Sequence, residues 1–239
     1  MILAAGLGTR LRPLTDHTPK VLIEIAGRPI LAWIGERLAA AGADRIVINV
    51  HHHADQIERF VETGWDIDAE PVLSFEIDRP LGTGGGLLHA APHFRGDRTI
   101  LLHVGDVITD LDLAGLAEHH IEGDAAVTLA VHDRETERFL RFDDAGLSGR
   151  EDLRRDLVIE ARPPIGPVRR FAFAGVHAIS PDLIERFTER GAFGILEPYL
   201  RLAAEGTRIA PHDVTGAEWL ELGNPERLEQ ARRALSGEA

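Results

Sequence analysis

Residues 1–11 read MILAAGLGTRL, an apolar run of strand length followed at once by a turn that contains Gly6 and Gly8. Because glycine has no Cβ atom, the backbone amides of such a turn can point inward around an anion. Arg10 and Lys20 bracket the turn and offer two cations to a polyphosphate. A tight turn with a purely structural purpose is an equally weighted alternative. The dinucleotide fingerprint and the P-loop are excluded, because neither a third glycine at the required spacing nor a Gly-Lys-Ser/Thr string follows.

Beyond this turn, apolar runs of strand length alternate with segments of helical periodicity. Such alternation is typical of a mostly parallel sheet with helices on both faces, so the predicted fold class is α/β, a three-layer sandwich. Ligands of these sheets bind beyond the carboxyl ends of the strands. Strands are predicted at 1–4, 45–50, 71–75 and 99–104, and helices at 28–41, 54–62 and 84–91.

The second half of the chain contains hairpin signals in place of crossover signals, which predicts an antiparallel addition to the sheet. The charged run 148–156 and the proline-rich run 162–167 predict a surface loop or lid. Asn224 is expected to cap the last helix. Residues 1–239 contain no linker or internal repeat, so a single domain is predicted. The expected strands are 125–131, 139–142 and 170–178, and the expected helices are 195–205 and 225–235.

The composition limits the classes of function. The chain has 39 Asp and Glu and only 26 Lys and Arg, so its formal net charge is -13. This negative charge argues against nucleic acid or an anionic membrane as a partner. The chain has no cysteine, so disulfides, thiolate metal sites and cysteine nucleophiles are excluded. No apolar run approaches the length of a membrane span, and the first residues lack the cationic start of a signal peptide. A cytoplasmic location is therefore expected.

Several strings of residues together resemble the signature of the sugar-1-phosphate nucleotidyltransferases, also called nucleoside-diphosphate-sugar pyrophosphorylases. The resemblance implies a Rossmann-like fold for nearly the whole chain. Within the family, the chain is most similar to the N-acetylmuramate 1-phosphate uridylyltransferases of bacterial cell-wall recycling, which share the strings at 83–86 and 105–110. The matching strings are 6–15 (GLGTRLRPLT), 19–20 (PK), 27–29 (GRP), 80–86 (PLGTGGG), 105–110 (GDVITD), 173–175 (FAG) and 219–223 (WLELG).

The resemblance implies a Mg²⁺-dependent transfer of a nucleotidyl group from a nucleoside triphosphate to a sugar 1-phosphate, with release of pyrophosphate. Two anions must be brought together, which requires positive charge, a divalent ion and positioning of the nucleophile. UTP with N-acetylmuramate 1-phosphate or a related sugar 1-phosphate is the favoured pair. The alternatives are a mannose or heptose 1-phosphate guanylyltransferase, a glucose 1-phosphate thymidylyltransferase, and a non-catalytic regulatory subunit that binds nucleotide sugars.

Asp106 follows the predicted strand 99–104, so its carboxylate is expected at the carboxyl end of a strand. Magnesium prefers hard oxygen ligands and commonly takes only one or two protein carboxylates beside phosphates and water. By the family pattern a second aspartate comes from a Trp-x-Asp-x-Gly-Thr string, and in this chain Glu221 stands in its place. Asp106 and Glu221 are therefore the predicted metal ligands. A turn or helix cap is the alternative for Asp106 and is favoured for Asp110 and Asp112.

The resemblance also assigns the phosphate contacts. Arg10 is expected to face the leaving pyrophosphate, and Lys20 to link the triphosphate to the acceptor phosphate; together with Asp106 they form the predicted catalytic set. Two solvated surface cations are the alternative for this pair. Glu76 is a weaker candidate for base recognition and is expected to be a solvated strand residue. The other predicted nucleotide-binding residues are Leu3, Ala4, Ala5, Gly6, Gly8, Thr9, Gly82 and Thr83, and the glycines from 82 to 86 are expected to let a base or ribose approach the backbone.

Gly105, Arg162 and Gly175 are the predicted sugar-phosphate contacts. Some family members carry Glu-Lys-Pro where this chain has residues 161–163 (ARP), so Arg162 is expected to supply the cation. The missing glutamate leaves the identity of the acceptor sugar open. A monomer or small homo-oligomer is expected.

Two further features have mainly structural interpretations. The adjacent histidines 51–53 end a predicted strand, and strand alternation sends neighbours to opposite faces, which favours a hydrogen-bonding loop over a metal site. Trp33, Trp65 and Trp219 are expected to pack in the core or at its rim, with a place in the sugar pocket as the alternative for Trp219.

Overall fold

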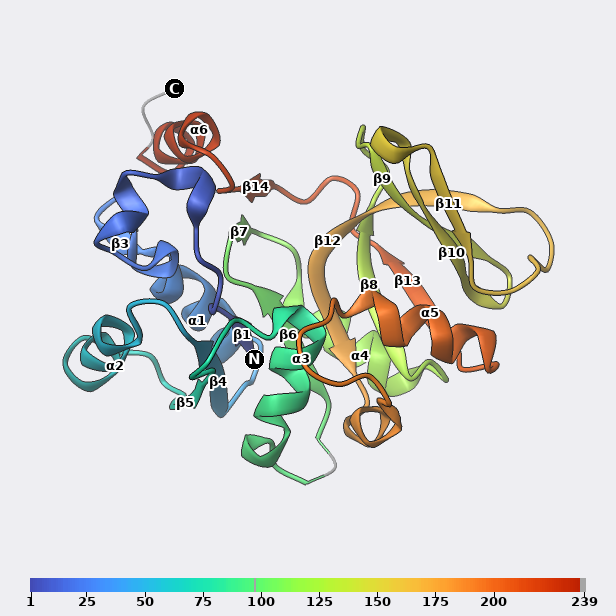
Figure 1. The fold of residues 1–239 in the computed structure, drawn as a ribbon, viewed down its shortest axis with the longest axis horizontal. Coiled ribbons are helices and arrows are strands. Elements are labelled where there is room, and N and C mark those ends of the chain that lie inside the picture. Colours follow the sequence, from blue (N-terminus) through green and yellow to red (C-terminus); the bar gives the residue numbers. More distant parts are fainter. Residues whose placement is uncertain (97, 237–239) are drawn as a thin grey trace.

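The computed structural model describes residues 1–96 and 98–236, and its main feature is one mixed sheet of ten strands (Figure 1). These strands are β1 Ile2–Leu3, β4 Arg45–Val50, β5 Glu70–Phe75, β6 Ile100–Val104, β8 Val127–His132, β9 Arg138–Asp143, β10 Gly146–Asp152, β11 Leu157–Glu160, β12 Arg169–Ile179 and β13 Ile209–Asp213. The longest path runs in the order β11-β10-β9-β12-β6-β1-β4-β5, with β8 beside β12 and β13 beside β8.

Parallel pairing dominates the first half of the sheet and antiparallel pairing the second, apart from β13, which is parallel to β8. In the first half, β1 pairs in parallel with β4 and β6, and β4 pairs in parallel with β5. Strand β12 joins the two halves, because it is antiparallel to β6 as well as to β8 and β9. The α/β class with an antiparallel addition is thereby confirmed.

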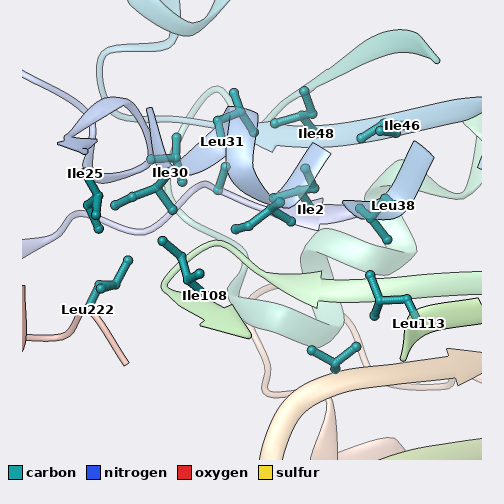
Figure 2. Close-up of a cluster of buried hydrophobic side chains, with 14 of the residues drawn as sticks. Ile2, Ile25, Ile30, Leu31, Leu38, Ile46, Ile48, Ile108, Leu113 and Leu222 are labelled. Atoms are coloured by element: carbon teal, nitrogen blue, oxygen red, sulfur yellow. The ribbon is translucent and has the colours of Figure 1, made fainter. Parts of the chain in front are cut away.

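Helices cover both faces of the sheet, and each face has its own apolar core. The helices are α1 Ile30–Ala40, α2 Ala54–Thr63, α3 Gly82–Ala90, α4 Leu113–Glu122, α5 Leu196–Ala204 and α6 Pro225–Ser236. Helices α1, α2, α4 and α6 contribute to the cluster around Ile2 and Ile48, part of which Figure 2 shows. Helices α3 and α5 contribute to the cluster around Leu102 and Tyr199. Ile2 and Leu3 of β1 pack against different clusters, as alternation along a strand requires.

The charged run 148–156 was expected to be a loop or lid, and this prediction is wrong. Most of it belongs to β10, which lies between β9 and β11, and residues 153–155 form a 3-10 turn. Charged residues suit this part of the sheet because they pair across strands: Arg141 of β9 lies 3.4 Å from Glu151 of β10 and 3.3 Å from Glu160 of β11. The proline-rich run 162–167 has no regular secondary structure, as predicted.

Two short strand pairs lie outside the main sheet: β2 (Glu24–Ile25) with β3 (Arg28–Pro29), and β7 (Val107–Thr109) with β14 (Trp219–Glu221). The first pair takes the residues expected at the start of α1, which therefore begins at Ile30. The second pair links segments more than a hundred residues apart in the sequence. Asn224 caps α6 as predicted, since its Oδ1 accepts a hydrogen bond from Arg227 N at 2.9 Å. Within the part of the chain that the structure describes, no helix has the length and apolar character needed to cross a membrane.

Candidate active site

Two adjoining cavities open beyond the carboxyl ends of the parallel strands. The smaller, of about 210 Å³, lies against the turn that follows β1. The larger, of about 1020 Å³, extends from there to the antiparallel strands β9 and β10. Leu3, Thr83, Val104 and Asp106 line both cavities, so the two form one continuous site.

Most of the predicted site residues line this site. Gly8, Thr9 and Arg162 are the exceptions, since they line neither cavity. Gly8 instead shapes the turn: its backbone has a φ of 62°, and its carbonyl oxygen accepts a hydrogen bond from Thr15 Oγ1 at 2.9 Å. The smaller cavity is lined by Leu3, Ala4, Ala5, Gly6, Lys20, Gly82, Thr83, Gly105 and Asp106. The larger cavity is lined by Leu3, Arg10, Thr83, Asp106, Gly175 and Glu221.

Lys20 and Asp106 meet where the cavities join. Strand β6 places Asp106 just past its carboxyl end, and Lys20 begins a 3-10 turn after the first loop. Lys20 Nζ donates a hydrogen bond to Asp106 Oδ2 at 2.9 Å, and the Lys20 side chain is only 12% exposed. Burial lowers the pKa of Lys20, while the Asp106 carboxylate opposes this shift. A partly desolvated cation in this position can meet phosphate groups from either cavity.

The pairing of β7 with β14 brings the two predicted metal ligands to one edge of the site. Glu221 lies opposite Val107 in the pair, and Leu222 N donates a hydrogen bond to the backbone oxygen of Asp106 at 2.8 Å. The Glu221 carboxylate contacts Arg227 and lies 3.8 Å from Arg10 Nη1. Two carboxylates and the predicted pyrophosphate-binding arginine thus share one side of the larger cavity.

A buried chain of hydrogen bonds holds the nucleotide-side loops together. Asn49, near the end of β4, accepts a hydrogen bond from Ala4 N at 2.7 Å and donates one to Glu76 Oε1 at 2.6 Å. Glu76 Oε2 accepts from Leu81 N at 2.6 Å, one residue before α3 begins. Glu76 is 3% exposed, so the prediction of a solvated strand residue is wrong. Asn49 was not among the predicted site residues. A polar residue within an otherwise apolar strand is the feature that could have indicated it.

The glycine run in α3 has a different purpose from the one expected. A Cβ atom at Gly84 would lie 2.4 Å from the Phe193 ring, and one at Gly86 would lie 2.6 Å from Asn49 Nδ2. These glycines are buried and let α3 pack closely against its neighbours. Only Gly82 and Thr83 of the run line the cavities, so the expectation that residues 84–86 meet a base is corrected.

Gly175 and Trp219 line the larger cavity near Asp106. Gly175 has a φ of 81°, and a Cβ atom there would lie 2.6 Å from Val104 Cγ2. Trp219 Nε1 donates a hydrogen bond to Ala174 O at 2.9 Å, so the indole is fixed against the strand that carries Gly175. The alternative raised for Trp219, a place in the pocket, agrees with this position.

Arg162 lies apart from the site, in contrast to the predicted contact with the sugar phosphate. Its two Nη atoms donate hydrogen bonds to the Asp143 carboxylate at 2.8 and 2.6 Å. The Asp143 side chain is fully buried, and the bonds from Arg162 are the main cause that lowers the pKa of Asp143 to about 2. A buried carboxylate needs such a partner, which gives Arg162 a structural explanation.

The adjacent histidines belong to a hydrogen-bonded loop, as favoured. His51 Nδ1 lies 2.5 Å from Glu76 O, and His53 Nε2 lies 3.2 Å from Asp16 O. Among the residues described, no group of three or more His, Cys, Asp or Glu side chains could hold a metal ion. Any divalent ion in this site would therefore depend on few protein ligands and on substrate phosphates.

A glycine-containing turn and a Lys–Asp pair lie together beyond the carboxyl ends of parallel strands. This arrangement suits an enzyme that brings two phosphate-bearing substrates together. The sequence profile of the nucleotidyl transferase family matches residues 1–146, and the chain belongs to this family as a sugar-1-phosphate nucleotidyltransferase. The chain is 33% identical over 237 residues to N-acetylmuramate alpha-1-phosphate uridylyltransferase of Neisseria meningitidis, which covers 99% of this chain and 97% of that protein.

Two further comparisons place the chain within a wider group. It is 29% identical to the mannose-1-phosphate guanylyltransferase of Mycobacterium tuberculosis, over 95% of this chain and 61% of that protein. Among solved structures, a UDP-glucose pyrophosphorylase complexed with UDP-glucose is similar with a TM-score of 0.77 and 18% identity, over 100% of this chain and 98% of that one. At this identity the structural similarity shows the shared fold alone.

Proposed function

We propose that the enzyme transfers a uridylyl group from UTP to N-acetylmuramate 1-phosphate or a related sugar 1-phosphate. An oxygen of the sugar phosphate attacks the α-phosphorus of UTP, the bond from that phosphorus to the bridging oxygen breaks, and pyrophosphate leaves. The position of the Lys20–Asp106 pair at the junction of the two cavities carries the proposal. The smaller cavity, beside the first turn, accepts the nucleotide, and the larger one accepts the sugar phosphate.

The proposed work of the charged residues follows from their positions. Lys20 contacts the phosphates of both substrates and offsets their repulsion as the nucleophile approaches. Arg10, whose side chain is 66% exposed at the rim of the larger cavity and lies 3.8 Å from Glu221, exchanges this long contact for the departing pyrophosphate. No residue forms a covalent bond with the nucleotide, since the reaction needs only positioning and charge stabilisation.

Nucleotidyl transfer in this family generally uses a divalent metal ion, and we propose Mg²⁺. Asp106 and Glu221 fit such an ion, because both are hard oxygen donors at one edge of the site and phosphates with water can complete the octahedron. When bound, the ion neutralises charge that develops on the phosphates. Arg10 and Arg227 hold the Glu221 carboxylate near this edge.

A pyrimidine base is proposed from the construction of the smaller cavity. Its lining consists largely of small residues and backbone, which can match the alternating acceptor and donor edge of uracil. Guanine would require an acceptor for its amino group, and Glu76 is not available because Asn49 and Leu81 already donate to its two oxygens. Guanylyl transfer and thymidylyl transfer are the alternative activities that the assay below distinguishes from uridylyl transfer.

The test is a panel of pyrophosphate-release assays. UTP, dTTP, GTP and ATP are each combined with N-acetylmuramate, N-acetylglucosamine, glucose and mannose 1-phosphates, and kcat/KM is measured for every pair. We expect UTP to exceed GTP by about tenfold to a hundredfold, since one unpaired buried polar group costs about 1–3 kcal/mol. A higher value for GTP would replace the proposed uridylyl transfer with guanylyl transfer, and no turnover with any pair would favour a regulatory subunit.

We propose that the enzyme acts in the cytoplasm, where nucleoside triphosphates are available. We also propose a monomer or small homo-oligomer.

A further inference from the structure

The antiparallel wall of the larger cavity carries many charged side chains, most of which neutralise one another. Glu137 contacts Arg154, Asp152 lies 3.5 Å from Arg138, and Glu151 lies 3.4 Å from Arg141. Glu135, the remaining carboxylate of this wall, is solvent-exposed, where water screens its charge. The acidic residues of the wall are thus largely compensated.

Two arginines of the same wall lack this compensation. Within residues 1–96 and 98–236, Arg134 and Arg150 make no ion pair, although both line the cavity. The Nε atom of each is buried and has no hydrogen-bond partner, and the Arg134 guanidinium reaches only the Glu135 backbone oxygen at 3.5 Å. Both side chains are half-buried, and a half-buried cation without an acidic partner favours an anion from outside the chain.

Both arginines line the cavity that the proposed function assigns to the sugar phosphate. The Arg134 guanidinium lies 4.0 Å from the centre of the Trp219 ring, and Trp219 is bonded to Ala174 beside Gly175. Trp219 also lies two residues before Glu221 on β14. Arg150 stands on β10 opposite Leu140 of β9, and both residues line the cavity. Arg134 thus lies beside Trp219, and Arg150 lies on the β9–β10 wall of the same cavity.

We propose that Arg134 and Arg150 bind a carboxylate on the acceptor sugar, so that the enzyme selects an acidic sugar 1-phosphate. This inference rests on the proposed function, because it assumes that the larger cavity holds the sugar. N-acetylmuramate carries a carboxylate on its lactyl ether in addition to the phosphate at C1. The guanidinium fork matches a carboxylate with two parallel hydrogen bonds, which a phosphate-binding lysine could not supply.

The test compares two acceptors that differ only in the lactyl ether, N-acetylmuramate 1-phosphate and N-acetylglucosamine 1-phosphate. With UTP and the full chain, kcat/KM is measured for the wild type, Arg134→Gln and Arg150→Gln. Arg154→Gln is the matched control, because Arg154 lines the same wall and already has Glu137 as its partner. Arg134→Lys keeps the charge and removes the fork.

We expect the wild type to prefer the acidic acceptor by about tenfold or more, and each glutamine variant to lose most of that ratio while its kcat/KM for N-acetylglucosamine 1-phosphate stays within about twofold. Arg134→Lys should recover only part of the ratio, and Arg154→Gln should leave it unchanged. Equal losses on both acceptors, or a wild type without preference, would overturn the inference and leave uridylyl transfer standing. A wild type that uses UTP with neither acceptor would overturn the proposed function and the inference with it.

Discussion

Asp106 is fixed by two contacts of different kinds. Its carboxylate accepts a hydrogen bond from Lys20, and its backbone oxygen accepts one from Leu222 N. The side chain is nevertheless 35% exposed, so it remains accessible to ligands from both cavities. At the scale of single residues, the chemistry that we propose for the site depends mainly on this aspartate, its lysine partner and Glu221.

Asp106→Asn should abolish turnover and leave the fold intact. A neutral amide binds Mg²⁺ poorly and leaves phosphate charge uncompensated, while the partly exposed position limits the effect on stability. Pyrophosphate release at saturating Mg²⁺, together with urea unfolding, checks both halves of this expectation. Near-normal turnover would remove Asp106 from the catalytic set.

Lys20→Ala should cost about 3 kcal/mol or more of transition-state stabilisation, a loss on the order of a hundredfold in kcat/KM. The reason is that the ammonium meets charge as it develops between the two phosphates. Arg12→Ala is the control, since Arg12 is an exposed cation of the same loop that lies 3.2 Å from Asp16. A change in KM alone would identify Lys20 as a uniform binding contact.

Glu221 departs from the family pattern. Its role can be tested by comparing a variant that loses the charge with one that only shortens the side chain. If it is the second metal ligand, Glu221→Gln should reduce kcat much more than Glu221→Asp, because water can fill the gap left by one methylene but cannot replace the charge. The Mg²⁺ concentration that gives half-maximal kcat should rise only in the glutamine variant. Equal and mild effects would place Glu221 outside the metal shell.

At the scale of secondary-structure elements, Asn49 and Glu76 join the ends of β1, β4 and β5 to the start of α3. Both side chains are buried, and together they set the position of the Ala4 amide and of the residue before Gly82. Since Ala4 and Gly82 line the smaller cavity, the shape of the proposed nucleotide site depends on Asn49, which lines this cavity, and on Glu76, which does not.

Glu76→Gln should therefore weaken both stability and nucleotide binding. The amide of the new glutamine has one oxygen, which can accept a hydrogen bond from only one of the two donors, Asn49 Nδ2 or Leu81 N. The glutamine NH2 group then faces the other donor, and that contact is lost. We expect a loss of about 1–3 kcal/mol in the free energy of unfolding and a higher KM for the triphosphate. Urea unfolding and steady-state kinetics measure these two quantities. Glu58→Gln, on the exposed side of α2, should change neither, and an unaltered KM in Glu76→Gln would contradict the positioning effect.

At the scale of the whole molecule, buried histidines make stability depend on pH. Burial lowers the pKa of His103 to about 4 and that of His177 to about 3. In the unfolded chain both have a pKa of about 6.5, so below that pH the unfolded state binds more protons than the folded state. The stability that these two histidines contribute is therefore complete above pH 6.5 and declines as the pH falls from about 6.5 toward 4.

We expect these two histidines together to lower the free energy of unfolding by about 2–3 kcal/mol for each pH unit below about 6, since each unprotonated buried histidine contributes about 1.4 kcal/mol per unit. Urea unfolding at pH 7.5, 6.0, 5.5 and 5.0 measures the slope. His177→Asn should reduce it by about half, because one proton is removed from the balance. A stability that stays flat between pH 7 and 5 would contradict this expectation.

The sequence by itself determined the alternation of strands and helices and the residues of the phosphate-binding turn. Both depend on local information: the periodicity of apolar residues reports which side of an element is buried, and a glycine turn after a strand constrains its own backbone. The first strand and its turn could therefore be predicted from a few neighbouring residues, whereas the roles expected of Lys20 and Asp106 came from the resemblance of longer strings to a known family. Even the cap of α6 at Asn224 follows from adjacent positions.

Only the tertiary structure decided how distant segments share one site. It pairs β7 with β14 and so brings Glu221 beside Asp106, it buries Glu76 between Asn49 and Leu81, and it gives Arg162 to Asp143 instead of a substrate. Charge alone suggested a loop at 148–156, whereas cross-strand partners make it a strand. A charged residue has the same sequence pattern whether its partner is water, another side chain or a ligand, and that partner is chosen only when the chain folds.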